Sequence, residues 1–249
     1  MAYTTIDKPE DYFNTVLYTG NGTDNHAITG VNFQPDFVWI KPRNEARGHH
    51  LQDVIRGVNG VLNTNENSAE YTGLTNVIKS FDSDGFTLGT SNDVNKSANT
   101  HVAWNWLAGG SASSNSDGSI TSTVSAGITQ GMSIVSYTGT GSVETIGHGL
   151  GTTPAMIILK NRTISGDYWH VYHQSLGGTK ALYLQTTDAV ATTSGSWNNT
   201  NPTSTVFTNG SSTYTNSSEY IAYCFAEKKG YSKFGSYTGN GNADGTFIY

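Results

Sequence analysis

The sequence contains little of what many classes of protein depend on. Its 249 residues include one cysteine, Cys224, which excludes an intrachain disulfide and a cysteine-based zinc site. Charged residues make up only 13% of the chain and form no basic run, so we expect no binding to nucleic acid through phosphate contacts. No apolar stretch approaches about 18 residues, so we expect no membrane insertion. The polar, acidic N-terminus predicts no secretory signal and fits release by cell lysis.

The residues that are abundant favour short strands joined by turns. The chain has 29 glycines and is rich in threonine, asparagine and serine, which are typical of turns. Aromatic residues reach 11%, and together with the low charge they argue against disorder. No useful stretch has a helical period, so the composition predicts an all-β chain.

One phrase recurs along the chain, as LYTGNG at 17–22, SYTGTG at 136–141 and SYTGNG at 236–241. The first two copies are offset by 119 residues, from Tyr18 to Tyr137. The same offset aligns PDFVWIK with PAMIILK, and VAWNWLA with IAYCFAE. One offset that fits both ends indicates two repeats of nearly equal length, each opened by the phrase as a first strand and its turn.

We predict two tandem β-sandwiches of jelly-roll type with a partial third repeat at the C-terminus. The alternative is a single pseudo-symmetric domain with one shared core. The third opening is expected to lie along the second repeat or a neighbouring chain, or to begin a further domain. The predicted boundaries are an N-terminal arm at 1–13, a first repeat at 14–108, a linker rich in glycine and serine at 109–131, a second repeat at 132–230 and the start of a third at 231–249.

The aligned strands show what they bury. Residues 35–41 and 154–160 are apolar on both faces, which predicts central strands with Lys41 and Lys160 emerging at the edge. The last strand of each repeat alternates large aromatic residues with small ones. We expect this aromatic face to pack against the opposite sheet, with Cys224 as a small packing residue.

Motifs for catalysis are missing. The sequence has no nucleophile elbow and no phosphate loop, and nothing nominates a pair of carboxylates for glycoside hydrolysis. The acidic pair Asp82 and Asp84 precedes Gly85 in a hairpin-turn pattern, which we favour over a calcium loop because further acidic ligands are absent. We therefore expect no enzyme, no metal and no cofactor.

Aromatic side chains beside hydrogen-bonding groups permit sugar binding. The segment GDYWHVYH at 166–173 concentrates both kinds of group, and the loop GSWNNTNP carries a further tryptophan. The competing interpretation, which we favour slightly, places Trp169 and Tyr172 in the core or an interface. The candidate glycan-binding residues are Trp169, His170, Tyr172, His173 and Trp197.

Motifs along nearly the whole chain resemble a repeat family of tailed-phage genomes, common in phages of marine bacteria. They include YFNTVLYTGNG, SFDSDGFTLG, TIGHGLGTTPAMIILKNR and YIAYCFAEKKGYSKFGSYTGNG. In that family the repeat is attached to tail fibre or other virion structural proteins. The resemblance implies a virion protein at the phage surface and supplies no catalytic or receptor residue.

Two functional hypotheses follow. The first is a virion structural protein of a tail fibre, tail tip or capsid decoration, assembled with other virion proteins as a homo-oligomer. A trimer is the expected oligomer by analogy with fibres, and host attachment is an expected role. The second is a carbohydrate-binding module without catalysis, which recognises host surface polysaccharide. In either case we expect the protein in the extracellular virion, made in the host cytoplasm.

Overall fold

A computed structural model describes residues 4–210 and 216–247 of the chain. Strands dominate the described residues, so the predicted all-β class is confirmed. Helical structure in this described part of the chain is limited to a 3-10 turn, Pro9–Asp11, and one short helix, α1 (Asn92–Asn95).

Two antiparallel sheets lie in the N-terminal half of the chain. The first has five strands in the order β1 (Phe13–Thr19), β8 (Thr100–Trp106), β3 (Phe37–Pro42), β4 (His50–Asp53) and β5 (Gly57–Asn63). The second has three strands in the order β2 (His26–Thr29), β7 (Gly85–Leu88) and β6 (Ile78–Asp82).

Two further antiparallel sheets lie in the C-terminal half. The larger has eight strands in the order β16 (Ala191–Thr192), β15 (Lys180–Tyr183), β14 (His170–His173), β13 (Met156–Asn161), β18 (Asn216–Phe225), β11 (Met132–Thr140), β10 (Ser122–Gly127) and β9 (Ser113–Asn115). The smaller pairs β12 (Glu144–Gly147) with β17 (Val206–Asn209).

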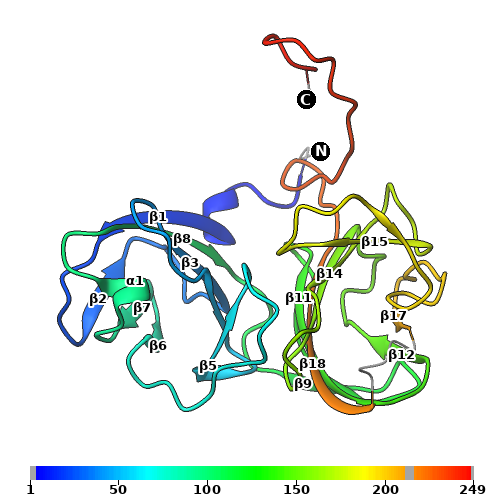
Figure 1. Cartoon of the computed structure of the whole chain (residues 1–249), viewed down its shortest axis with the longest axis horizontal. Coiled ribbons are helices and arrows are strands. Elements are labelled where there is room, and N and C mark those ends of the chain that lie inside the picture. The colour runs from blue at the N-terminus through cyan, green and yellow to red at the C-terminus, as the bar shows by residue number, and fades with distance from the viewer. Residues whose placement is uncertain (1–3, 211–215, 248–249) are drawn as a thin grey trace.

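The four sheets stack in a row, and Figure 1 shows them side by side. Alternate residues of each large sheet point to opposite faces, so each large sheet contributes side chains to two cores. Val38 and Ile40 of β3 join the core under the three-stranded sheet, whereas Phe37 joins the core between the two large sheets. Ile221 and Tyr223 of β18 enter that same middle core from the other side.

The segment expected to be a linker, residues 109–131, is folded into the eight-stranded sheet. It supplies β9 and β10, and Val124 is buried in the core of the C-terminal half. Its small residues permit close backbone contact, because a Cβ at Gly109 would collide with the backbone of Ala126. At Gly109 the lack of a side chain therefore permits a close backbone approach.

The sequence predicted that Lys160 emerges at the sheet edge, and this prediction is wrong. Its side chain is fully buried, and Nζ donates a hydrogen bond to the backbone oxygen of Asp167 at 2.9 Å. Burial lowers the pKa of Lys160 to about 8. The partner of Lys160 thus lies seven residues further along the chain, at Asp167. The local sequence pattern does not reveal this contact.

The C-terminal segment also differs from its prediction. Residues 235–247 are exposed and contain no strand, and the segment extends away from the sheets in Figure 1. Hydrogen bonds within the segment include that from Thr246 Oγ1 to the backbone oxygen of Thr238 at 2.8 Å. It therefore does not lie along the second repeat. The end of the expected strand TFIY falls outside the described residues.

Candidate functional site

Four aromatic side chains share one face of the five-stranded sheet. The register places Phe13 beside Trp106 and Trp39 beside Trp104 on neighbouring strands, and the period of two points all four side chains to the same side. The ring centroids of Phe13 and Trp106 are 4.6 Å apart, and those of Trp39 and Trp104 are 5.7 Å apart.

The eight-stranded sheet covers only part of this face. Phe37, Leu51 and Leu62 are buried in the middle core, whereas Trp39 and Trp104 are only half-buried. The expectation that the whole aromatic face packs against an opposing sheet is therefore wrong for the first half. The open part forms a groove of about 520 Å³, which we call the aromatic groove. It is lined by Phe13, Trp39, Lys41, His49, Trp104 and Trp106.

A second hollow continues the aromatic groove toward the C-terminal half. It has a volume of about 200 Å³ and shares Phe13 and Trp106 with the groove. Its far wall includes Phe225, Tyr231 and Phe234, which lie at the base of the C-terminal segment. Together the two hollows form an apolar depression along the seam between the large sheets.

Lys41 and His49 are the two titratable side chains that line the aromatic groove. Lys41 Nζ donates to the backbone oxygen of Pro42 at 3.0 Å and forms no ion pair with an acidic side chain of the described residues. Burial and the nearby Lys41 ammonium lower the pKa of His49 below its ordinary value. The lining includes no carboxyl group, so the groove holds no acid–base pair for glycoside hydrolysis.

Concave, aromatic surfaces with few polar groups are typical of ligand sites, and exposed apolar patches of this kind mark interaction surfaces. Flat aromatic rings can stack against the apolar faces of a ligand, and Lys41 can pair with an anion. The geometry therefore fits binding.

A family model described as a domain of unknown function (DUF7483) matches residues 8–249. The chain belongs to the DUF7483 family. No curated protein and no solved structure matches it.

Three of the candidate residues expected to bind glycan are buried in this DUF7483 chain. Trp169 and Trp197 are 0% and 1% exposed, and Tyr172 is also buried. Trp169 Nε1 donates to the backbone oxygens of Asn63 and Glu66, so it anchors the first half on the second. Tyr172 and Trp197 pack edge to face in the C-terminal core. These three residues cannot stack on an external sugar.

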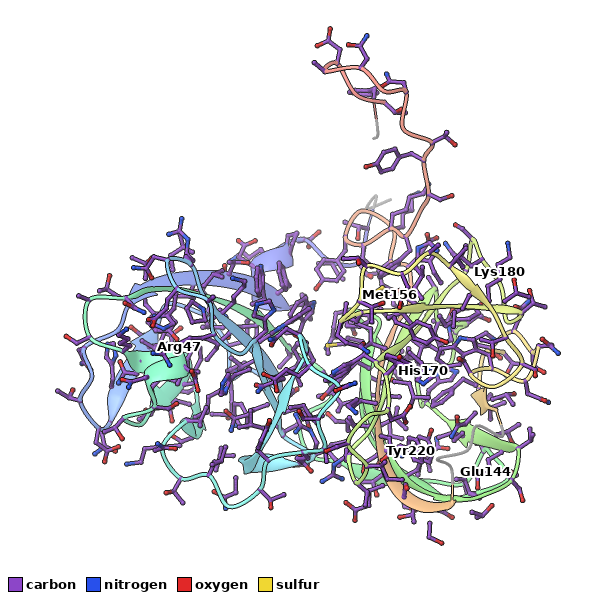
Figure 2. The ribbon with its side chains drawn as sticks, in the orientation of Figure 1. Arg47, Glu144, Met156, His170, Lys180 and Tyr220 are labelled. Carbon is purple, nitrogen blue, oxygen red and sulfur yellow. The ribbon has the colours of Figure 1, made fainter. Side chains whose placement is uncertain are left out.

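His170 lies in a polar cluster of the C-terminal half (Figure 2). Its Nδ1 is 2.8 Å from Ser196 Oγ and its Nε2 is 3.2 Å from Asp167 Oδ1. The three groups have the order of a nucleophile, a base and an orienting acid. However, the adjoining cavity of about 10 Å³ has room for a single water, and Ser196 is buried. The cluster ties loops together and offers no substrate space.

The remaining candidate, His173, is half-buried and accepts a hydrogen bond from the Ser175 backbone N–H at 3.2 Å. The five predicted residues thus do not form one exposed site. Within the described parts of the chain, no group of three or more His, Cys, Asp or Glu residues could hold a metal ion. No helix among the described residues is long and apolar enough to cross a membrane.

Sequence reasoning placed the tryptophans of the aromatic groove in the core. A signal for their exposure lies in the comparison of the repeats. At the offset of 119 residues, Trp39 corresponds to Ile158, Trp104 to Tyr223 and Trp106 to Phe225. At these three positions the first half therefore carries a tryptophan where the second carries a smaller side chain that the middle core buries.

Proposed function

We propose that this chain is a non-catalytic structural protein of a phage virion, and that it adheres to polysaccharide on the host surface. The observation that supports adhesion is the aromatic groove, which the half-buried tryptophans Trp39 and Trp104 line on a rigid sheet. A sheet holds its side chains in place at little entropic cost on binding. The resemblance to phage repeat proteins supports the location in a virion.

Assembly is the second part of this proposal. We expect the chain to act beside other virion proteins and to form a homo-oligomer, with a trimer as the arrangement suggested by analogy with fibres. A purified chain that remains monomeric across a concentration series in mass photometry and is readily degraded by protease would contradict this part.

Adhesion can be tested on polysaccharide extracted from the surface of the bacterium that the phage infects. The chain is labelled with a fluorophore and its binding to the immobilised polymer is measured. Trp39→Ala and Trp104→Ala should each weaken binding at least about tenfold, because single aromatic anchors dominate such sites. Tyr71→Ala, which removes an exposed aromatic side chain outside the groove, is the matched control and should bind like wild type.

The alternative is a carbohydrate-binding module without a virion role. It differs from the proposed virion protein only in where the chain is located. Antibody against the chain, bound to intact particles and seen by immunogold electron microscopy, separates the two. Label on the particle supports the virion protein, and sugar binding without label supports the free module. Unchanged product sizes after incubation with the polymer are expected in either case.

A further inference from the structure

We infer that the aromatic groove takes an anionic polysaccharide, one whose sugar rings carry carboxylate or sulfate groups. This inference rests on the proposed function and names the ligand class of that same groove. It is carried by the position and charge of Lys41 beside Trp39 and Trp104.

Lys41 differs from most other basic side chains of the first half in having no acidic partner. Arg47 pairs with Glu45 and Asp93, Lys96 pairs with Glu45, and Lys79 pairs with Asp24. No ion pair joins Lys41 to an acidic side chain of the described residues, although it is half-buried. A half-buried lysine without an acidic partner is a site that favours an anion.

The register places this charge at the end of the stacking surface. Trp39 lies beside Trp104, and Lys41 lies beside Val102, one same-face position further along β3 and β8. Same-face positions on a strand are about 7 Å apart. A sugar ring stacked on Trp39, whose plane is inclined by 59° to that of Trp104, would therefore hold a charged substituent within reach of Lys41 Nζ.

Other occupants fit the groove less well. Nucleic acid is disfavoured, because one lysine is too little basic charge for a phosphate backbone and the whole chain has a net charge of -6. A purely apolar partner would bury Lys41 without a counter-ion, which costs free energy. The acidic surface of the chain repels anions elsewhere, so binding should be confined to the groove.

The test uses three polymers and the intact chain in isothermal titration calorimetry at low salt. Polygalacturonate supplies carboxylates, dextran sulfate supplies sulfates, and dextran is neutral. We expect wild type to bind at least one anionic polymer about tenfold more tightly than dextran, as one charge-assisted contact allows. The anionic polymer that binds more tightly shows whether the groove prefers carboxylate or sulfate groups.

Lys41→Gln should abolish this preference and leave the weak binding to dextran unchanged, whereas Lys41→Arg should restore it. Lys180→Gln removes a lysine from the second half, labelled in Figure 2, and is the matched control. Trp104→Ala should weaken binding to all three polymers. Melting curves confirm that each variant is folded.

Equal affinity of wild type for dextran and the anionic polymers, or an unchanged preference in Lys41→Gln, would overturn the inference and leave the proposed adhesion intact. Failure of wild type to bind these polymers and the extracted host polysaccharide would remove both. Self-association that Trp104→Ala abolishes, without polymer binding, would assign the groove to a second copy of the chain instead and would also overturn the inference.

Discussion

Lys41 and Lys160 occupy corresponding positions near the ends of β3 and β13, yet one borders an open groove and the other is fully buried. The large sheets share the strand order β1-β8-β3-β4-β5 and β11-β18-β13-β14-β15. They also share a stacked aromatic pair, Tyr18 with His101 and Tyr137 with Tyr220 in the second half. The two large sheets thus share a strand order but differ in how far their corresponding side chains are exposed.

The difference arises from how the two sheets meet. The aromatic face of the second half is buried in the middle core. In the first half Phe37, Leu51 and Leu62 are buried there, whereas Trp39 and Trp106 pack against it only in part. The aromatic face of the second half is therefore core, whereas part of the aromatic face of the first half is surface that a ligand can reach. The same strand pattern can serve stability in one copy and binding in the other.

Breaking the contact between the halves should have the largest effect on stability. The buried Arg56 lies 2.6 Å from Asp53 Oδ2 and 2.7 Å from Glu70 Oε1, and it also reaches the Tyr223 hydroxyl. Burial acts to lower the pKa of Arg56, but Asp53 and Glu70 raise it above its ordinary value. Arg56→Met should lower the free energy of unfolding by about 3–5 kcal/mol, because it leaves the buried Asp53 carboxylate without its cation, although Glu70 keeps its ion pair with Arg162.

Denaturant titration followed by circular dichroism measures this loss. The control is Arg43→Met, which replaces an exposed arginine and should change stability by less than about 0.5 kcal/mol. A loss below about 1 kcal/mol in Arg56→Met would mean that the network does not hold the halves together.

Tryptophan substitutions should separate core from surface. Trp169→Ala removes a fully buried indole and its two hydrogen bonds, so we expect a loss of about 3–5 kcal/mol in unfolding free energy. Trp104→Ala empties a half-open position and should cost about 1 kcal/mol. Equal losses, measured in the same denaturant series, would contradict the assignment of one residue to the core and the other to the groove.

The two lysines should differ in their effect on the pH dependence of stability. Burial lowers the pKa of Lys160 to about 8, below its unfolded value of about 10.4. Between these values the unfolded chain binds one proton more than the folded chain, so this group makes stability rise with pH, by at most about 3 kcal/mol. Below pH 8 the lysine is protonated in both states and adds no slope.

Lys160→Met should remove that rise. The measurement is the unfolding free energy of wild type and of the variant at pH values from 7.5 to 10, and the difference between the two proteins should change over this range. Lys41→Met retains Lys160 and should keep the slope of wild type. A wild-type slope that survives in Lys160→Met would show that the buried lysine does not titrate in this range.

The smallest expected effect is a pH dependence of ligand binding. Because the pKa of His49 is lowered, its imidazole is neutral at pH 7.5 and gains a proton only at acid pH. Lys41 and His50 oppose that proton and Glu66 favours it. Affinity for dextran sulfate should rise by roughly threefold from pH 7.5 to pH 5, as expected of one partly screened charge. His49→Gln should bind equally at both pH values, and a rise that persists in it would exclude His49.

Local pattern predicted the all-β class, the strands at corresponding positions and their burial on both faces. It failed where exposure depends on a distant segment. Trp197 lies in a polar loop, yet that loop folds against Tyr172 and buries the indole. Lys160 ends an apolar strand, yet Asp167 covers it. The aromatic groove exists because one half covers only part of the other, and no strand period encodes that.

The most direct test follows the five indole N–H signals by two-dimensional NMR while dextran sulfate or polygalacturonate is added. We expect the signals of Trp39, Trp104 and Trp106 to shift together and saturably, whereas those of Trp169 and Trp197 stay in place. Shifts confined to Trp169 or Trp197, or no shift of the groove tryptophans while the polymer binds, would contradict this expectation.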